Sequence, residues 1–225
     1  MIVQSRIFEV FEEKKGRKPC LFTKNLVAGQ SVYGERLLMQ EGVEYREWQP
    51  ERSKLAAVIM KGSPDIGIRK RDVVLYLGAA TGTTVSHVSD IIGEEGFVFA
   101  LDFAPRVVRD LYFLCLERKN IAPILADANK PRSYAGNICQ ADVVYQDIAQ
   151  KNQVEILLKN CELFLKDGGC ALLAVKARSI DVTKRPKDIF KQVREQLENK
   201  MRIVDCRELE PYQKDHCFFM LKKHS

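Results

Sequence analysis

From about residue 73 the chain alternates short apolar stretches with segments of helical periodicity. We expect strands at VVLYLG (73–78), FVFALD (97–102), APILAD (122–127), ADVVYQDI (141–148) and CALLAVKA (170–177). The intervening TTVSHVSDIIG, PRVVRDLYFLCLERKN and NQVEILLKNCELFLKDGG read as helices: the first capped by its threonines, the second opened by Pro105, the third closed by two glycines. Strands alternating with helices predict right-handed crossovers and a Rossmann-like, doubly wound, mostly parallel α/β sheet.

The C-terminal part departs from this alternation. After a long amphipathic helix, PKDIFKQVREQLENK, two strands follow each other through a short turn, MRIVDCREL (201–209) and HCFFMLKK (216–223). Strands joined in this way pair antiparallel. We therefore expect an antiparallel hairpin at one edge of the sheet.

Residues 1 to about 50 have another character. The pieces FEVFEE, PCLFTKNL, QSVYGERLL and VEYREWQ are short, apolar and bounded by turn residues, which is typical of a small antiparallel sheet. The first convincing helix, RSKLAAVIMKG, begins at residue 52. The predicted organisation is a small N-terminal β domain, 1–51, and an α/β domain, 52–225.

Composition excludes several classes of protein. No apolar run approaches the roughly 20 residues of a membrane span, and the N-terminus lacks the apolar centre of a secretory signal. The seven cysteines contain no C-x-x-C, so we expect buried thiols in a reducing cytoplasm, with neither zinc nor disulfides. A net charge of +6 permits a nucleic-acid partner without requiring one.

Polar residues follow four of the predicted strands, at GAATGTT (78–84), LDF (101–103), LADA (125–128) and QDIAQ (146–150). In a doubly wound sheet the ligand binds beyond the carboxyl ends of the strands. These segments therefore predict a ligand pocket. Each of the two aspartates at 102 and 127 also suits a simple helix-capping role.

Three kinds of ligand are candidates for this pocket. An NTP loop needs Gly, four residues, then Gly-Lys-Ser/Thr, which GAATGTT does not provide. A dinucleotide loop has G-x-G-x-x-G, whereas here the spacing is G-x-x-x-G, although Asp102 falls where a carboxylate would hold a ribose. S-adenosylmethionine has adenosine but no phosphate, so its loop needs close backbone approach and no anion nest. The loop spacing and the edge hairpin favour S-adenosylmethionine and leave the dinucleotide open.

The segments YLGAATGTTVSHVSDIIG, ERKNIAPILADANKP, DVVYQDIAQ, AVKARSIDVTK and LEPYQKDHC, with NLVAGQSVYGERLL and EYREWQPERSKLAAVI, resemble the fibrillarin family in its archaeal-type form. The resemblance implies an S-adenosylmethionine-dependent RNA 2'-O-methyltransferase that works in a box C/D guide ribonucleoprotein. Its partners would be the guide RNA, target rRNA or tRNA, a Nop-family scaffold and, indirectly, a kink-turn-binding protein. A protein (glutamine) methyltransferase and a non-catalytic assembly subunit are the alternatives.

The resemblance also implies the site residues. Many relatives have Glu where this chain has Asp102, which keeps the carboxylate. The expected cofactor-binding residues are Gly78, Ala79, Gly82, Thr83, Thr84, Asp102, Phe103, Asp127, Ala128, Asp147, Ile148, Ala149 and Gln150.

Likeness to 2'-O-methyltransferases of the Lys-Asp-Lys-Glu/His type points to Lys54, Asp147, Lys176 and His216 as catalytic residues. In our hypothesis Lys176 removes or orients the hydroxyl proton and Asp147 orients Lys176. His216 acts behind them or positions Lys54, and His87 is an ordinary structural histidine. The basic segment after Lys176 supplies candidates for RNA phosphate contacts, namely Arg178, Lys184, Arg185 and Lys187.

Overall fold

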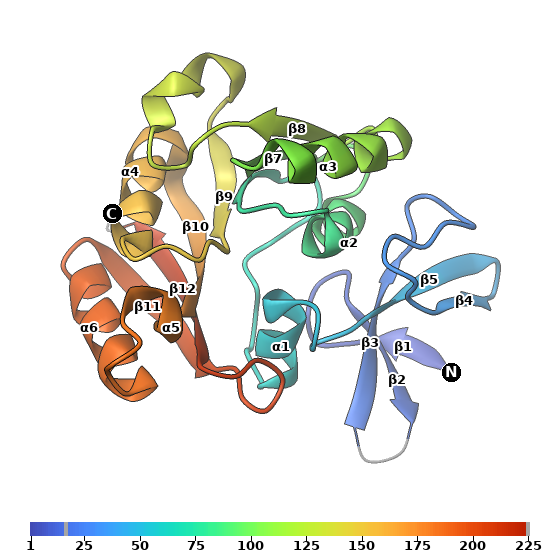
Figure 1. Ribbon diagram of the computed structural model, residues 1–225. Helices are drawn as coiled ribbons and strands as arrows, with labels where there is room; N and C mark the ends of the chain where they lie inside the picture. Colours follow the sequence, from blue (N-terminus) through green and yellow to red (C-terminus); the bar gives the residue numbers. More distant parts are fainter. Residues whose placement is uncertain (16–17, 224–225) are drawn as a thin grey trace.

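The computed structural model describes the backbone of residues 1–15 and 18–223 and the side chains of 1–13 and 19–223. The basic cluster KKGRK, at 14–18, lies outside the described side chains. Two sheets organise the fold, one of five strands and one of seven (Figure 1). No helix in the described ranges is long and apolar enough to cross a membrane.

The larger sheet has the strand order β11-β12-β10-β9-β6-β7-β8. Its parallel strands are β6 (Val73–Leu77), β7 (Phe97–Asp102), β8 (Ile121–Leu125), β9 (Ala141–Gln146) and β10 (Leu165–Lys176). The hairpin of β11 (Met201–Glu208) and β12 (His216–Lys223) pairs antiparallel with β10 through β12. The predicted doubly wound sheet with an antiparallel edge hairpin is confirmed.

Helices cover both faces of this sheet, and strand alternation decides which residues meet them. Val74 and Tyr76 of β6 face one cluster of buried residues, which contains the apolar sides of α1 (Lys54–Met60), α2 (Thr83–Ile92) and α3 (Pro105–Glu117). Leu75 and Leu77 face the other, with α4 (Gln153–Phe164), α5 (Ala177–Ile180) and α6 (Pro186–Glu198). Two short 3-10 turns, Pro131–Ser133 and Ala135–Asn137, lie between β8 and β9.

The smaller sheet is antiparallel, with the order β1-β2-β3-β5-β4. Its strands are β1 (Ile2–Gln4), β2 (Phe11–Lys15), β3 (Lys18–Lys24), β4 (Leu37–Gln40) and β5 (Val43–Trp48). It lies beside α1 and α2, away from α4 and α6 (Figure 1).

Buried polar groups join the small sheet to α2. Asp90 of α2 accepts hydrogen bonds from Thr23 Oγ1 (2.7 Å) and Arg46 Nε (2.8 Å), and Arg118 Nη1 reaches its other oxygen (2.6 Å). His87 is fully buried, stacked on Trp48 with ring centroids 4.9 Å apart. Its place in this interface agrees with a structural role.

Two predicted elements were wrong. QSVYGERLL is mostly a turn, because Gly34 has φ +80 and the Glu35 carboxylate accepts from the backbone of Val32 and Tyr33, so β4 begins only at Leu37. The predicted helix through 169 ends at Phe164, because buried Leu165 already pairs with Ala141 of β9. The two glycines lie inside β10.

The threonine cap of α2 was also wrong. Gly82 occupies the N-cap with φ +97, and Thr83 and Thr84 are the first helical residues. The short helix α5, directly after Lys176, was not predicted.

Candidate active site

The four polar strand ends surround one cavity of about 340 Å³ at the carboxyl edge of the large sheet. It is lined by Gly78, Ala80, Leu101, Asp102, Phe103, Ala126, Asp127, Ala128, Asp147, Ile148, Ala149 and Gln150. Most of the predicted cofactor residues therefore come together here. Ala79, Gly82, Thr83 and Thr84 do not line the cavity, whereas Ala80, Leu101 and Ala126, which were not predicted, do.

The loop after β6 is fixed by its backbone. Gly78 and Ala79 donate to the carbonyl of Leu101 (2.9 and 3.0 Å), and the N–H of Ala80 donates to Asp102 Oδ2 (3.1 Å). Gly78 has φ +84, and a Cβ there would stand 2.3 Å from the carbonyl oxygen of Asp147. Glycine is thus required where the loop passes against the end of β9.

The second glycine of the loop serves packing. A Cβ on Gly82 would stand 2.3 Å from Leu114 Cδ2 of α3. Gly82 therefore makes room for a neighbouring helix, and its part in cofactor binding stays a prediction.

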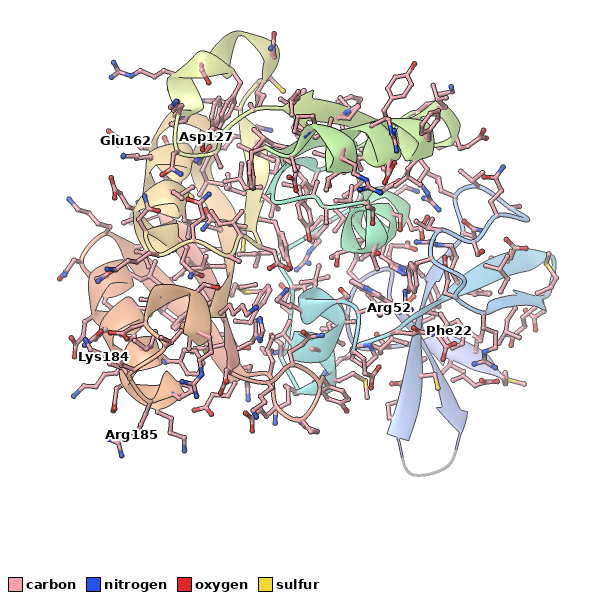
Figure 2. All side chains as sticks on the ribbon, viewed as in Figure 1. Phe22, Arg52, Asp127, Glu162, Lys184 and Arg185 are labelled. Carbon is pink, nitrogen blue, oxygen red and sulfur yellow. The ribbon has the colours of Figure 1, made fainter. Side chains whose placement is uncertain are left out.

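Three carboxylates line the cavity, at the ends of three strands. Asp102 is held by backbone donors, since Ala104 N–H binds its Oδ1 (3.1 Å) and Ala80 its Oδ2. Asp127 Oδ1 accepts from the N–H of Asn129 (2.9 Å), and Figure 2 labels this aspartate beside the 3-10 turns. The ring of Phe103 is 68% exposed at the cavity.

The donor set tests which ligand fits. None of the described residues that line the cavity is a lysine or arginine, so the only charged side chains that a phosphate group would meet there are carboxylates, which repel it. Carboxylates suit ribose hydroxyls, amino groups and a positively charged sulfonium, and an exposed aromatic ring suits an adenine face. The residues present therefore fit S-adenosylmethionine better than a nucleotide with phosphates.

The four candidate catalytic residues come together, since the charges of Lys54, Asp147 and Lys176 all act on His216. Lys54, the first residue of α1, places its Nζ 2.8 Å from Asp147 Oδ2, with both side chains about one-fifth exposed. Lys176 is exposed at the end of β10 and pairs in register with His216 at the start of β12. The hypothesis that Asp147 orients Lys176 is not what the structure has, because its ion pair is with Lys54.

Burial lowers the pKa of His216, and the positive charges of Lys54 and Lys176 lower it further, while the carbonyl of Lys214 and the charge of Asp147 raise it. His216 Nδ1 lies 2.6 Å from the carbonyl of Lys214. In the neutral ring Nδ1 donates to that carbonyl, which leaves Nε2 as an acceptor.

The deciding observation comes from comparison with known proteins. The family model described as Fibrillarin matches residues 2–225. The chain belongs to the fibrillarin family. A fibrillarin-like rRNA/tRNA 2'-O-methyltransferase of Thermococcus onnurineus is 50% identical over 214 residues, covering 95% of this chain and 94% of that protein.

Solved fibrillarins agree with the fold. The structure of Aeropyrum pernix fibrillarin with natively bound S-adenosyl-L-methionine has 43% identity and a TM-score of 0.90, over 98% of this chain and 99% of that one. A fibrillarin/Nop5p complex has 44% identity and a TM-score of 0.87, over 97% and 99%.

In this fibrillarin the turn between β11 and β12 is tied to the segment before α1. Gln213 Nε2 donates to the carbonyls of Pro50 (3.1 Å) and Glu51 (2.6 Å), and Lys61 Nζ donates to the carbonyl of Glu210 (2.8 Å). The turn that leads into His216 is thus fixed to the helix that carries Lys54. Gln213 was not predicted from the sequence, because no local pattern marks it.

The basic residues after Lys176 differ in whether a side chain of this protein already pairs with them. Arg178 Nε binds Asp215 Oδ2 (3.1 Å) and Arg185 Nε binds Asp188 Oδ2 (2.9 Å). Lys184 makes one long contact with Gln192 (3.5 Å). Figure 2 shows Lys184 and Arg185 on the outside of the fold at the start of α6.

Lys187 makes no hydrogen bond or ion pair with any described side chain. It lines a hollow of about 490 Å³ together with Arg185 and His216. The basic segment therefore borders the candidate catalytic residues.

Proposed function

We propose that this fibrillarin is an S-adenosylmethionine-dependent RNA 2'-O-methyltransferase, the catalytic subunit of a box C/D guide ribonucleoprotein that acts on pre-rRNA and tRNA. The observation that carries the proposal is the Lys54–Asp147 ion pair (2.8 Å) at the rim of a cavity lined by three carboxylates and no basic residue among the described ones. Asp147 thus belongs to two sites. One suits the activation of a neutral nucleophile, and the other suits a cationic cofactor without phosphate.

The cofactor's residues are assigned from the cavity. Asp102 would hold the ribose hydroxyls, Phe103 would lie against the adenine, and Asp127 with the backbone of Ala128 would bind the adenine edge. The segment from Asp147 to Gln150 would hold the remainder. When bound, S-adenosylmethionine supplies an electrophilic methyl group on its sulfonium.

The residues beside the cavity suit activation of a ribose hydroxyl. That hydroxyl is a weak acid, so its oxygen must lose the proton as it reacts. The ammonium of Lys54, fixed by Asp147, would stabilise negative charge developing on the oxygen. Lys176, exposed at the end of β10, would remove or orient the proton, and His216 would act beside it.

Target choice is proposed to lie with partners. The fibrillarin/Nop5p complex is a relative with 44% identity, which supports a Nop-family scaffold for this chain. The guide RNA would select the nucleotide, and a kink-turn-binding protein would join through RNA and scaffold. The isolated chain is then expected to bind RNA weakly, in a salt-sensitive way, and to transfer methyl groups poorly.

The test is methyl transfer by Lys176→Ala and Lys54→Ala in a particle assembled with guide RNA, scaffold and kink-turn-binding protein. Both changes should lower the transfer rate by about 100-fold or more, since a general base and a group that stabilises developing negative charge each contribute roughly that factor. A target with a 2'-deoxy nucleotide should not be methylated. Near-normal turnover of Lys176→Ala would contradict its assignment.

Two other functions are outcomes of the same experiments. Calorimetry that finds no S-adenosylmethionine binding would indicate a non-catalytic assembly subunit. Methylation of a glutamine-containing protein, with the guided RNA left unmodified, would indicate a protein methyltransferase.

A further inference from the structure

The N-terminus of α1 is held by a side chain from the loop-and-helix segment that follows β6. Ser53 is the N-cap of α1, and its Oγ accepts from the N–H of Ala56 (3.3 Å). Thr84 of α2 donates its Oγ1 hydrogen to the same Ser53 Oγ (3.1 Å). Ser53 is 1% and Thr84 8% exposed, so this bond is shielded from water.

Two buried tyrosines lie close to the Lys54–Asp147 pair. Tyr76 of β6 and Tyr145 of β9 stand opposite each other in register, with ring centroids 4.3 Å apart. Burial raises the pKa of Tyr76 and of Tyr145 well above the usual range, and the charge of Asp147 raises both further. Both phenols therefore stay protonated close to Asp147.

The Ser53–Thr84 hydrogen bond affects the position of Lys54, because Lys54 directly follows Ser53 in the chain. Helix α1 has only seven residues, so few hydrogen bonds of its own fix the direction of its first turn. The Lys54 Nζ nevertheless has to stand 2.8 Å from Asp147 Oδ2. The hydrogen bond between Ser53 and α2 therefore fixes the direction in which the Lys54 side chain points.

We propose that Thr84 and Ser53 are positioning residues of methyl transfer, acting through Lys54. Thr84 was expected to bind the cofactor, but its hydroxyl is committed to Ser53 and it does not line the cavity. The inference rests on the proposed role of Lys54. In this proposal the Ser53–Thr84 hydrogen bond aligns Lys54 with Asp147.

The test compares Thr84→Val with Thr84→Ser in the assembled particle. Thr84→Val keeps the shape and removes the hydroxyl, and it should lower kcat about tenfold while the Kd for S-adenosylmethionine and the KM for RNA stay within about twofold. Thr84→Ser retains the hydroxyl and should restore kcat. Ser53→Ala should reproduce the loss, which keeps the proposal testable if Thr84→Val does not fold.

The matched control is Thr23→Val. Thr23 is a buried threonine whose hydroxyl also bonds to α2, but at Asp90 in its last turn (2.7 Å), whereas Thr84 is in its first turn. Its loss should lower stability and leave kcat unchanged below the melting temperature. An equal loss of kcat in Thr23→Val would overturn the proposal, because any weakening of α2 would then suffice.

A double-mutant cycle separates this inference from the proposed function. If Thr84 acts through Lys54, Thr84→Val should cause no further loss in a Lys54→Ala background. A normal kcat for Thr84→Val beside an inactive Lys54→Ala would overturn only the positioning role. A rise in the cofactor Kd with unchanged kcat would overturn it too, in favour of direct cofactor binding. An active Lys54→Ala would instead contradict the proposed function.

Discussion

Lys176 and His216 face each other across neighbouring antiparallel strands, the last residue of β10 opposite the first of β12. The edge hairpin thus forms the last strands of the sheet and also positions a candidate catalytic residue. It carries His216 to the carboxyl end of β10, where the charges of Lys54, Asp147 and Lys176 all act on its pKa. Residues distant in sequence meet because an antiparallel strand begins where a parallel strand ends.

The first prediction concerns the titration of His216. Its pKa should lie below the usual value of about 6.5. Lys54→Met removes a nearby positive charge and should raise that pKa, whereas Asp147→Asn removes a negative charge and should lower it. NMR titration of the imidazole protons measures all three, and Lys70→Met, on a residue that does not act on His216, is the charge-matched control.

The sign for stability follows from the same shift. Because folding lowers the pKa of His216, the unfolded chain binds the proton more readily. The stability that the neutral form of His216 contributes is complete above about pH 6.5, the ordinary pKa of the unfolded chain. It is lost as the pH falls through the lower pKa of the folded state. A pKa of His216 that does not respond to Lys54→Met would mean that the two side chains are farther apart than the structure places them.

The second prediction concerns Gly78. Gly78→Ala would place a Cβ 2.3 Å from the backbone oxygen of Asp147, which cannot yield without moving the wall of the cavity. Cofactor affinity should fall at least about tenfold, equivalent to about 1.4 kcal/mol. Calorimetry with S-adenosylmethionine measures it.

Gly42→Ala is the control for Gly78→Ala. Gly42 has φ +78, close to the +84 of Gly78, but a Cβ there meets nothing within 4 Å. Both changes strain the backbone, and only one fills space beside Asp147. Equal losses of affinity would show that strain alone, and not the close approach to Asp147, explains the effect.

Part of this site was predictable because sequence position fixes it. Once the strands were recognised, Asp102, Asp127 and Asp147 had to lie at one edge of the sheet, since parallel strands end together. The same holds for Lys176 at the end of β10 and His216 at the start of β12. Backbone topology alone places these residues.

The remaining features depend on contacts between distant side chains. Gly82 looked like a ligand-loop glycine, but its neighbour Leu114 is on another helix. Asp147 was expected to orient Lys176, yet its carboxylate binds Lys54. The glycines at 168 and 169 resembled a helix end, although the pairing of Leu165 with β9 ends α4 earlier. Local patterns do not contain such information.

The third prediction concerns the buried charges between the small sheet and α2. Asp90→Asn would leave the guanidinium groups of Arg46 and Arg118 without their shared carboxylate in a site closed to water. Removing one partner of a buried ion pair costs about 3–5 kcal/mol. Urea unfolding followed by circular dichroism should show a loss of that size.

Glu95→Gln is the control for Asp90→Asn. It breaks the ion pair with Arg71 at the surface, where the two side chains are 59% and 70% exposed. Solvent screens that pair, so the unfolding midpoint should hardly move. Similar effects of the two substitutions would mean that the Asp90 cluster contributes no more than a surface pair.

The fourth prediction concerns RNA binding at the start of α6. Lys187 is exposed, unpaired with any described side chain, and shares a hollow with His216. If it contacts a phosphate, Lys187→Ala should weaken RNA binding similarly for different sequences. It should also reduce the slope of log K against log salt by about 0.7 to 0.9, the contribution of one phosphate contact.

Lys70→Ala serves as the comparison for Lys187→Ala. Lys70 is equally exposed but precedes β6, at the opposite edge of the sheet from the cavity. The two variants lose the same charge, so a general electrostatic attraction would be reduced alike in both. A smaller salt slope in Lys187→Ala alone would place the RNA backbone beside His216, whereas equal slopes would remove the basic segment from the binding surface.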